Sequence, residues 1–374
     1  MNKKIELLKS KFKKYNIDGY IIPKNDDYFT EYSKINRLQT ISNFSGSAGL
    51  AIILKNRNLL FVDGRYTIQS QIESGKYFKI LSFEKLVNLN LIKNLVLGVD
   101  PTLMTYDQTK RFFLQNNKLK YIKKNLIDLI KKPKISDSYK FFSLNKEIVG
   151  ESRNKKINKI SKHLKKNKSD YLFISAPENV AWVLNIRGKD SSNSPIPNAR
   201  LLISKSKKIL LIAKIEKCKK ILREKIVSSN EIIEIDKFSK KILSLKGKSF
   251  IIDNKSCSVF YEDLIKSKFM ISSREDPIYL LKAIKNKTEI KNMIKTHVSD
   301  GVALTKFLYW IKKVNKKKIT EIQAQNKLEK FRKMNKNYLY PSFDTIAGSG
   351  KNGAIIHYRA NKQNCRTIKK KDIF

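Results

Sequence analysis

The N-terminal part of the chain changes from a helical to an extended spacing of hydrophobic side chains. Over residues 5–15 the apolar positions recur at intervals of three and four, which predicts an amphipathic helix. DGYIIP at 18–23 predicts a strand. GLAIILKNRNLLFVDGR at 49–65 places two apolar runs around a short polar turn, which predicts a hairpin. This order is typical of a sheet covered by helices.

The same order of elements returns in the second third of the chain. Apolar positions at 157–164 predict a helix, SDYLFIS a strand and ARLLISKSKKILLIA a second hairpin. Short patterns can coincide by chance, but four elements in matching order favour an internal duplication. We therefore predict two related α/β domains at residues 1–131 and 151–275. The stretch 132–150 has turn residues and no clear period, so we expect a linker there.

A third segment, residues 276–374, has a different pattern. We expect Thr288 to be the N-cap of a helix roughly six turns long. The apolar stripe of this helix comprises Ile290, Met293, Ile294, Val298, Leu304, Leu308 and Ile311. His297 lies on that stripe and is expected to be a core histidine. Thr320 and Gln323 form a capping box that predicts the start of a second helix.

A glycine-rich loop near the end of the chain is the first candidate for chemistry. Gly348, Gly350 and Gly353 satisfy the spacing G-x-G-x-x-G, which binds a dinucleotide only when a helix follows the glycines. Here AIIHY at 354–358 follows and predicts a strand, so we reject a dinucleotide site. The strand carries His357. A single histidine on a strand is more often packed or exposed than catalytic, and the pattern alone leaves its role open.

The charge of the chain raises a second possibility. The 374 residues carry a formal net charge of +46, and lysine or arginine clusters can bind nucleic acid by releasing its counterions. Lysine far exceeds arginine, however, and it is spread along the whole sequence. Arginine is the better reader of phosphates and bases. A solvated, lysine-coated surface is therefore favoured, and we expect no specific nucleic-acid partner.

Cysteine use and hydropathy indicate the compartment. The three cysteines, Cys218, Cys257 and Cys365, have no C-x-x-C spacing, and their odd number fits a reducing environment. The N-terminus lacks the apolar core of a signal peptide. No run approaches the roughly 18 apolar residues of a membrane span. We expect a cytoplasmic, soluble protein without a membrane partner.

Several long motifs, in register along almost the whole chain, resemble a known family. These are ISNFSGSAGLAIILKNRNLLFVDGRYTIQSQ, LGVDPTLMT, APENVAWVLNIRGKDSSNSPIPNARLLI, DPIYLLKAIKNKTEIKNMIKTHVSDGVALTKFLYWI, TEIQAQNKLEKFR and PSFDTIAGSGKNGAIIHYRA. In this order they resemble the cytosolic three-domain aminopeptidase P enzymes, which are pita-bread metallopeptidases. PSFDTIAGSG in particular favours the three-domain enzymes over prolidases and creatinase.

The resemblance implies two creatinase-like N-terminal α/β domains, followed by the incomplete start of a pita-bread catalytic domain. It implies removal of the first residue from peptides that have proline in second position, with two divalent metal ions, usually manganese, as cofactors. His357 then takes the place of the family histidine that hydrogen-bonds the substrate or the tetrahedral intermediate, a role that suits an imidazole near neutral pH. Family members are often homodimers. No substrate-binding residue is assigned.

The family's metal ligands are two aspartates, a histidine and two glutamates, all downstream of the IIHY motif. Beyond the glycine loop this sequence offers only His357 and Asp372, and KKDIF, expected to open the next strand, ends at Phe374. Hard divalent ions need several oxygen ligands. We therefore expect a fragment that binds no metal and is inactive alone. A non-catalytic binding or dimerisation protein is the alternative, and a basic nucleic-acid-binding protein is a less favoured one.

Overall fold

The computed structural model describes residues 1–30, 33–87, 92–114, 116–133, 139–314 and 318–374. These residues form two compact units. The first comprises Met1–Asp63 with Ser70–Ile284, and the second comprises Gly64–Gln69 with Lys285–Phe374. None of the helices in the described part is long and apolar enough to cross a membrane.

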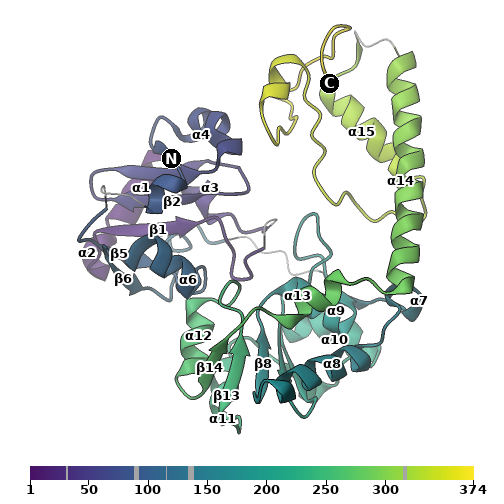
Figure 1. The fold of residues 1–374 in the computed structure, drawn as a ribbon. Coiled ribbons are helices and arrows are strands. Elements are labelled where there is room, and N and C mark those ends of the chain that lie inside the picture. The colour runs from purple at the N-terminus through teal and green to yellow at the C-terminus, as the bar shows by residue number, and fades with distance from the viewer. Residues whose placement is uncertain (31–32, 88–91, 115, 134–138, 315–317) are drawn as a thin grey trace. The chain divides into compact units, whose positions relative to one another are not determined.

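The N-terminal domain of the first unit is built on a six-stranded sheet in the order β4-β3-β2-β1-β5-β6 (Figure 1). The predicted strand is β1, Gly19–Pro23, and the predicted hairpin is β2, Leu50–Leu54, with β3, Asn58–Val62. The predicted N-terminal helix is divided into two shorter helices. The other elements are α1 Asn2–Lys9, α2 Phe12–Tyr15, α3 Arg37–Ser42, α4 Thr67–Ser74, β4 Lys79–Ser82, α5 Glu84–Val87, β5 Val96–Val99, α6 Tyr106–Thr109 and β6 Lys118–Tyr121.

The second domain repeats this sheet, in the order β12-β11-β10-β8-β13-β14. Its first strand pairs antiparallel with the hairpin and parallel with a later strand, as in the first domain. The duplication inferred from the sequence is confirmed in the fold. The elements are β7 Phe142–Ser143, α7 Lys146–Val149, α8 Arg153–Lys166, β8 Tyr171–Ile174, α9 Pro177–Leu184, β9 Ile186–Arg187, β10 Arg200–Ser204, β11 Ile209–Ile212, α10 Ile215–Arg223, β12 Ile232–Ile233, α11 Phe238–Ser244, β13 Ser249–Ile252, α12 Val259–Lys266, β14 Met270–Ser273 and α13 Pro277–Ala283.

The central strands of the second domain have continuous apolar runs, such as Leu201–Ile203, because both faces of the sheet are covered. On one face Leu201 and Leu211 belong to a cluster that includes residues of α8 and α9. On the other face Leu202 and Phe250 pack with residues of α11 and α12. A continuous apolar strand is therefore the expected pattern for these positions.

Part of the stretch expected to be a linker packs against the second domain. Residues 134–138 lie outside the described residues. Beyond them, Phe141 is fully buried in the core that includes α8 and α9. β7 then pairs antiparallel with β9, so residues 141–143 are held by side-chain burial and by backbone hydrogen bonds.

The second unit contains two helices, α14, Lys287–Lys313, and α15, Glu321–Arg332 (Figure 1). The capping box of α15 is confirmed, with the Thr320 hydroxyl accepting from the backbone N–H of Gln323. The N-cap predicted for α14 is wrong. Asn286 fills that position, because its carboxamide oxygen accepts the N–H groups of both Thr288 and Glu289.

The apolar stripe predicted for α14 is largely exposed. Ala303, Phe307 and Ile311 are its buried residues, and the last two pack in a small cluster with Ile319 and Ala324 of the α15 side. The predicted core histidine, His297, is exposed as well. The helix that the stripe predicted is confirmed, but the prediction of a core histidine is wrong, since the described residues provide no layer over this part of the stripe. The exposed positions of the stripe are Ile290, Met293, Ile294, Val298, Leu304 and Leu308.

Candidate functional site

His357 lies in a turn of the second unit, directly after the 3-10 helix η5, Gly350–Ala354. Its backbone has a φ of 59°, in the left-handed region that few side chains adopt. The Nδ1 atom is 2.9 Å from the hydroxyl of Tyr66, which belongs to the same compact unit. The rings of Tyr66 and Phe343 both meet the imidazole edge to face, each with a centroid distance of 5.8 Å. The side chain is therefore held between two aromatic rings.

The two strands predicted around this histidine are wrong. Residues 354–358 instead form turns, with Ile355 N–H donating to the Asn352 carbonyl and Tyr358 N–H to the Ile355 carbonyl. Residues 370–374 are also irregular. A strand needs a neighbour for its backbone groups, and the described part of the second unit has only an isolated bridge between Thr320 and Thr367.

A buried carboxylate organises the chain around His357. Glu321, at the start of α15, has no exposed surface. One carboxylate oxygen, Oε1, accepts from the backbone N–H and the hydroxyl of Ser349 at 2.6 and 3.0 Å. The other, Oε2, accepts from the Tyr358 hydroxyl at 2.8 Å and from the Arg366 backbone N–H at 2.9 Å. The Asn352 amide donates to both oxygens, at 3.2 and 3.0 Å.

The electrostatics of this cluster fix its protonation. Burial by itself would raise the pKa of Glu321, but the hydrogen bonds from Arg366, Ser349, Tyr358 and Asn352 together bring that pKa below its ordinary value. Burial, followed by the hydrogen bond to Glu321, raises the pKa of Tyr358 above its ordinary value. The carboxylate is therefore charged and the phenol is a hydrogen-bond donor at neutral pH.

The glycine loop closes around this carboxylate. Gly350 has a φ of +52°, a conformation that glycine adopts without a steric cost. A Cβ atom there would also collide with the guanidinium of Arg366. That guanidinium donates to the Ser349 carbonyl at 2.9 Å. The glycine at 350 thus permits a close approach of protein groups.

The described residues do not supply a two-metal site. They contain no group of three or more histidine, cysteine, aspartate or glutamate side chains that could hold a metal ion. Asp372 is used locally, accepting the N–H of Lys369 at 3.0 Å. The donor set around His357 consists of one carboxylate already saturated by N–H and O–H donors. It does not fit a pair of hard divalent cations, which need several free oxygen ligands.

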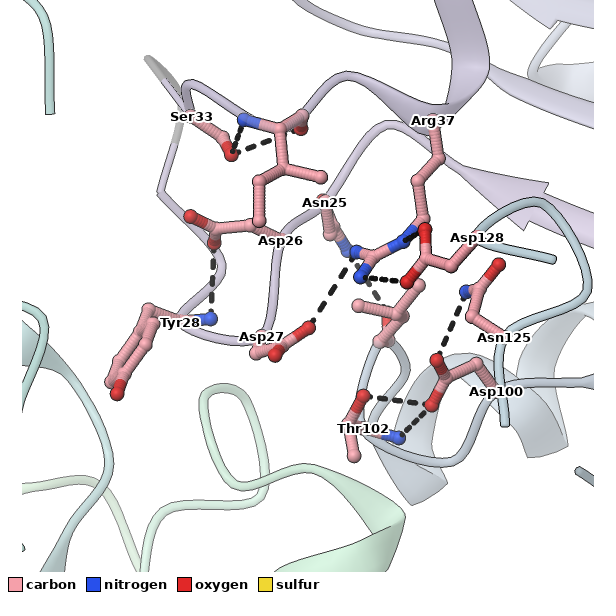
Figure 2. A network of polar contacts seen from close by, with 12 residues as sticks. Asn25, Asp26, Asp27, Tyr28, Ser33, Arg37, Asp100, Thr102, Asn125 and Asp128 are labelled. Carbon is pink, nitrogen blue, oxygen red and sulfur yellow. Dashed lines mark hydrogen bonds and ion pairs between the residues drawn. The ribbon is translucent and has the colours of Figure 1, made fainter. Parts of the chain in front are cut away.

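A second polar network lies inside the first unit (Figure 2). Arg37 donates through Nε and Nη2 to the two carboxylate oxygens of Asp128, both at 2.9 Å. Its Nη1 is 3.6 Å from the carboxylate of Asp27. Two further carboxylates in the same view, Asp26 and Asp100, accept hydrogen bonds from Tyr28, Thr30, Thr102 and Asn125.

This network joins the two domains of the first unit. Arg200, the first residue of β10, donates to the backbone carbonyl of Asp27. Its guanidinium lies 4.2 Å from the ring centroids of both Tyr28 and Tyr261. Because Arg37 and Arg200 are buried and each contacts acceptors or aromatic rings, we interpret the network as a structural joint between the two domains.

The sequence reasoning identified His357 but missed the groups that hold it. Glu321, Asn352, Tyr358 and Arg366 come from separate stretches, and their convergence has no periodic signal. The only local clue is that Glu321 follows the N-cap Thr320, where an acidic residue is usually explained by the helix dipole. In the structure this carboxylate instead accepts hydrogen bonds from Ser349, Tyr358 and Arg366.

Comparison with known proteins shows what this chain is similar to. Profiles described as the creatinase/prolidase N-terminal domain match residues 4–127 and 131–289, and the metallopeptidase family M24 profile matches residues 291–374. Xaa-Pro aminopeptidase 1 of Dictyostelium discoideum is 32% identical over 408 residues, covering 99% of this chain and 63% of the relative. The chain is a homologue of the Xaa-Pro aminopeptidases. It carries two creatinase-type N-terminal domains and part of an M24 metallopeptidase domain.

Two further proteins show the same similarity to this chain. Xaa-Pro aminopeptidase ApepP of Drosophila melanogaster is 30% identical over 384 residues, covering 96% of this chain and 62% of the relative. The crystal structure of an X-prolyl aminopeptidase from Caenorhabditis elegans, described as a cytosolic enzyme with a di-nuclear active site, has the same fold. Its TM-score is 0.89 at 24% identity, over 99% of this chain and 66% of that one. The homologue spans 60–65% of the length of the curated relatives it matches.

Proposed function

We propose that this chain carries the N-terminal domains and the opening catalytic segment of an Xaa-Pro aminopeptidase. The substrate would be a peptide with proline in second position, and the reaction would release the residue before it. The observation that supports this most strongly is the alignment of 99% of the chain with an enzyme of that name at 32% identity. The cytosolic location described for the nematode relative is part of the proposal, as is a homodimer.

We assign His357 as the catalytic residue of this segment. The Tyr66 hydroxyl lies 2.9 Å from Nδ1, and we take it as the donor in that hydrogen bond. The imidazole then carries its proton on Nε2. An N–H held between two aromatic rings suits a hydrogen bond to the scissile carbonyl, or to the oxyanion that forms from it.

Two divalent metal ions, manganese in our proposal, belong to the complete enzyme. Such a pair would polarise the carbonyl and generate the attacking hydroxide. The described residues lack a matching ligand set, so these ligands must come from other polypeptide. We therefore propose that the 374 residues alone do not hydrolyse Xaa-Pro peptides.

The test uses two proteins. The first is the chain itself, incubated with Mn²⁺ and an Xaa-Pro-Yaa peptide, from which we expect no release of the first residue. The second is a fusion to the part of the Dictyostelium relative that follows the aligned region, from which we expect release. His357→Ala in the fusion should lower kcat by at least about 100-fold. Turnover by the chain alone, or full activity of the His357→Ala fusion, would contradict the corresponding part of the proposal.

A non-catalytic role is the second candidate, and the missing ligand cluster in the described residues favours it. In that case the creatinase-type domains would serve binding or dimerisation. A fusion that folds and binds manganese but releases no product from any Xaa-Pro peptide would support this second role over the first.

A further inference from the structure

We propose that Glu321 is a positioning residue for His357, and that its carboxylate shapes the segment that carries this histidine. This inference rests on the proposed role of His357. Glu321 touches no substrate in this assignment. It acts by holding the turn that carries the imidazole.

The carboxylate gathers three separate stretches of chain. Ser349 and Asn352 come from the glycine loop, Tyr358 is the neighbour of His357, and Arg366 lies eight residues further on. All of them donate to the same buried group, at distances between 2.6 and 3.2 Å. Hydrogen bonds to a charged acceptor are stronger than those between neutral groups. The Glu321 carboxylate therefore holds all three stretches, while Asn364 makes further hydrogen bonds to Asn352 and Tyr358.

His357 lies inside a closed loop of this arrangement. Asn352 and Tyr358, on either side of it, bind the same carboxylate, and the Asn352 amide also donates to the Tyr358 hydroxyl at 2.9 Å. Turn hydrogen bonds link both of them to Ile355. The loop is thus pinned at both ends, which allows it to hold His357 at a φ of 59°. Such conformations persist where surrounding contacts over-determine them.

The remaining contacts show which parts depend on the carboxylate. Backbone hydrogen bonds join Glu321 N–H to the Arg366 carbonyl at 3.0 Å and Ile368 N–H to the Ile319 carbonyl at 2.8 Å. Phe307 and Ile311 of α14 pack with Ile319 and Ile368 in an apolar cluster. Loss of the carboxylate leaves both sets of contacts in place. Removing the carboxylate should therefore disturb the conformation of residues 349–358 but leave the packing of α14 against α15 unchanged.

Glu321→Gln is the informative substitution. Glutamine has nearly the same shape, but its NH2 group replaces an acceptor with a donor. Whichever way the amide turns, that NH2 faces N–H or O–H donors that need an acceptor. The matched control is Glu329→Gln on the same helix, where the carboxylate pairs with Lys333 at the surface. Both variants remove one negative charge from α15, and only one of them disturbs the His357 loop.

The experiment follows the imidazoles of the 374-residue chain by NMR with ¹³C-labelled histidine, in metal-free buffer. The chain has three histidines, and His357→Gln assigns the signal of interest. We expect Glu321→Gln to shift or broaden the His357 signal, while the signals of His163 and His297 stay in place. Glu329→Gln should move none of the three. An unchanged His357 signal in folded Glu321→Gln would overturn the proposal.

Folding is monitored through Trp310, which lies on α14 beside the apolar cluster. If Glu321→Gln unfolds the second unit, Tyr358→Phe replaces it, since that change removes one donor and keeps the carboxylate. Tyr358→Phe should shift the His357 signal in part, and an unmoved signal would again overturn the proposal. The readout needs no turnover, so it is independent of the activity tests on His357. An inactive fusion with a Glu321-dependent His357 signal would contradict the proposed function alone.

Discussion

The two compact units are stabilised in different ways. The first unit has large apolar clusters on its sheets, with strands buried on both faces. In the described part of the second unit, Phe307, Ile311, Ile319, Ala324 and Ile368 form a small cluster. Much of its order comes from the buried carboxylate of Glu321 and from helix caps.

This difference teaches where each unit is vulnerable. In the first unit the buried apolar surface is spread over many side chains. Its stability therefore depends on how closely these side chains pack. In the second unit the polar cluster is built around one acceptor, the Glu321 carboxylate. The order of this unit therefore depends on the charge of that side chain. The chain offers a separate reporter for each, because Trp182 lies in the first unit and Trp310 in the second.

The largest effect should come from a cavity in the first unit. Phe250 is fully buried, and its ring lies 4.8 Å from that of Tyr171 and 4.7 Å from that of Phe269. Phe250→Ala should lower the free energy of unfolding of this unit by about 4 kcal/mol. Denaturation followed at Trp182 should show this loss, while the transition at Trp310 keeps its midpoint. A loss shared equally by both reporters would mean that the units do not unfold independently.

The next effect is a pH dependence confined to the end of the first unit. Asp276 is buried at the N-cap of α13. Burial, with a smaller contribution from Asp253, raises its pKa from 3.8 to about 6, against the hydrogen bonds from Ile278 and Asn179 and the charge of Lys282. The folded state therefore binds a proton more tightly than the unfolded state. The stabilisation from this group is complete below pH 3.8 and is lost as the pH rises through about 6.

Comparison with Asp276→Asn isolates this contribution. The difference in free energy of unfolding, wild type minus variant, should fall by about 2 kcal/mol between pH 4 and pH 7. Asp170→Asn is the control of opposite sign, because the hydrogen bond from Lys205 and those from backbone N–H groups lower the pKa of Asp170. For Asp170→Asn, the difference in free energy of unfolding, wild type minus variant, should rise with pH in the acid range. If the two free-energy differences changed with pH in the same direction, the raised pKa of Asp276 would be refuted.

A smaller effect is expected at the joint between the two N-terminal domains. Arg200→Met removes the hydrogen bond to the Asp27 carbonyl and the contacts with the rings of Tyr28 and Tyr261. We expect a loss of about 2 kcal/mol, measured by denaturation at Trp182. Arg200→Lys keeps the charge but not the planar group, so it should recover only part of the loss. An Arg200→Met protein as stable as wild type would show that the apolar contacts hold the joint without this arginine.

The same contrast explains how far the sequence could predict the structure. Both sheets were predictable because β2 is apolar throughout, β10 has an apolar centre, and each follows a helix and a strand in the same order. The capping box at Thr320 is local and was predictable for that reason. The strand expected at 354–358 and the core position expected for His297 depend on neighbours that a local pattern does not specify.

The candidate site was predictable only in part, for a related reason. The family motif around IIHY identifies His357, but nothing in that motif indicates the left-handed turn in which the residue lies. Glu321 is 36 residues earlier in the chain. Its partners at Ser349, Asn352 and Tyr358 are brought together by the fold of the loop. Contacts between residues so far apart in the sequence have no local pattern from which they could be predicted.

The smallest effect should come from an exposed carboxylate in the second unit. Asp300 on α14 accepts from Nε and Nη2 of Arg332 on α15, at 2.6 and 3.1 Å. The Asp300 side chain is 47% exposed, so water and salt screen the pair, and Asp300→Asn should cost only about 0.5 kcal/mol. The loss, measured at Trp310, should vanish at about 1 M salt. A loss above about 2 kcal/mol would show that the order of this unit is shared among several carboxylates, and that Glu321 has no special place in it.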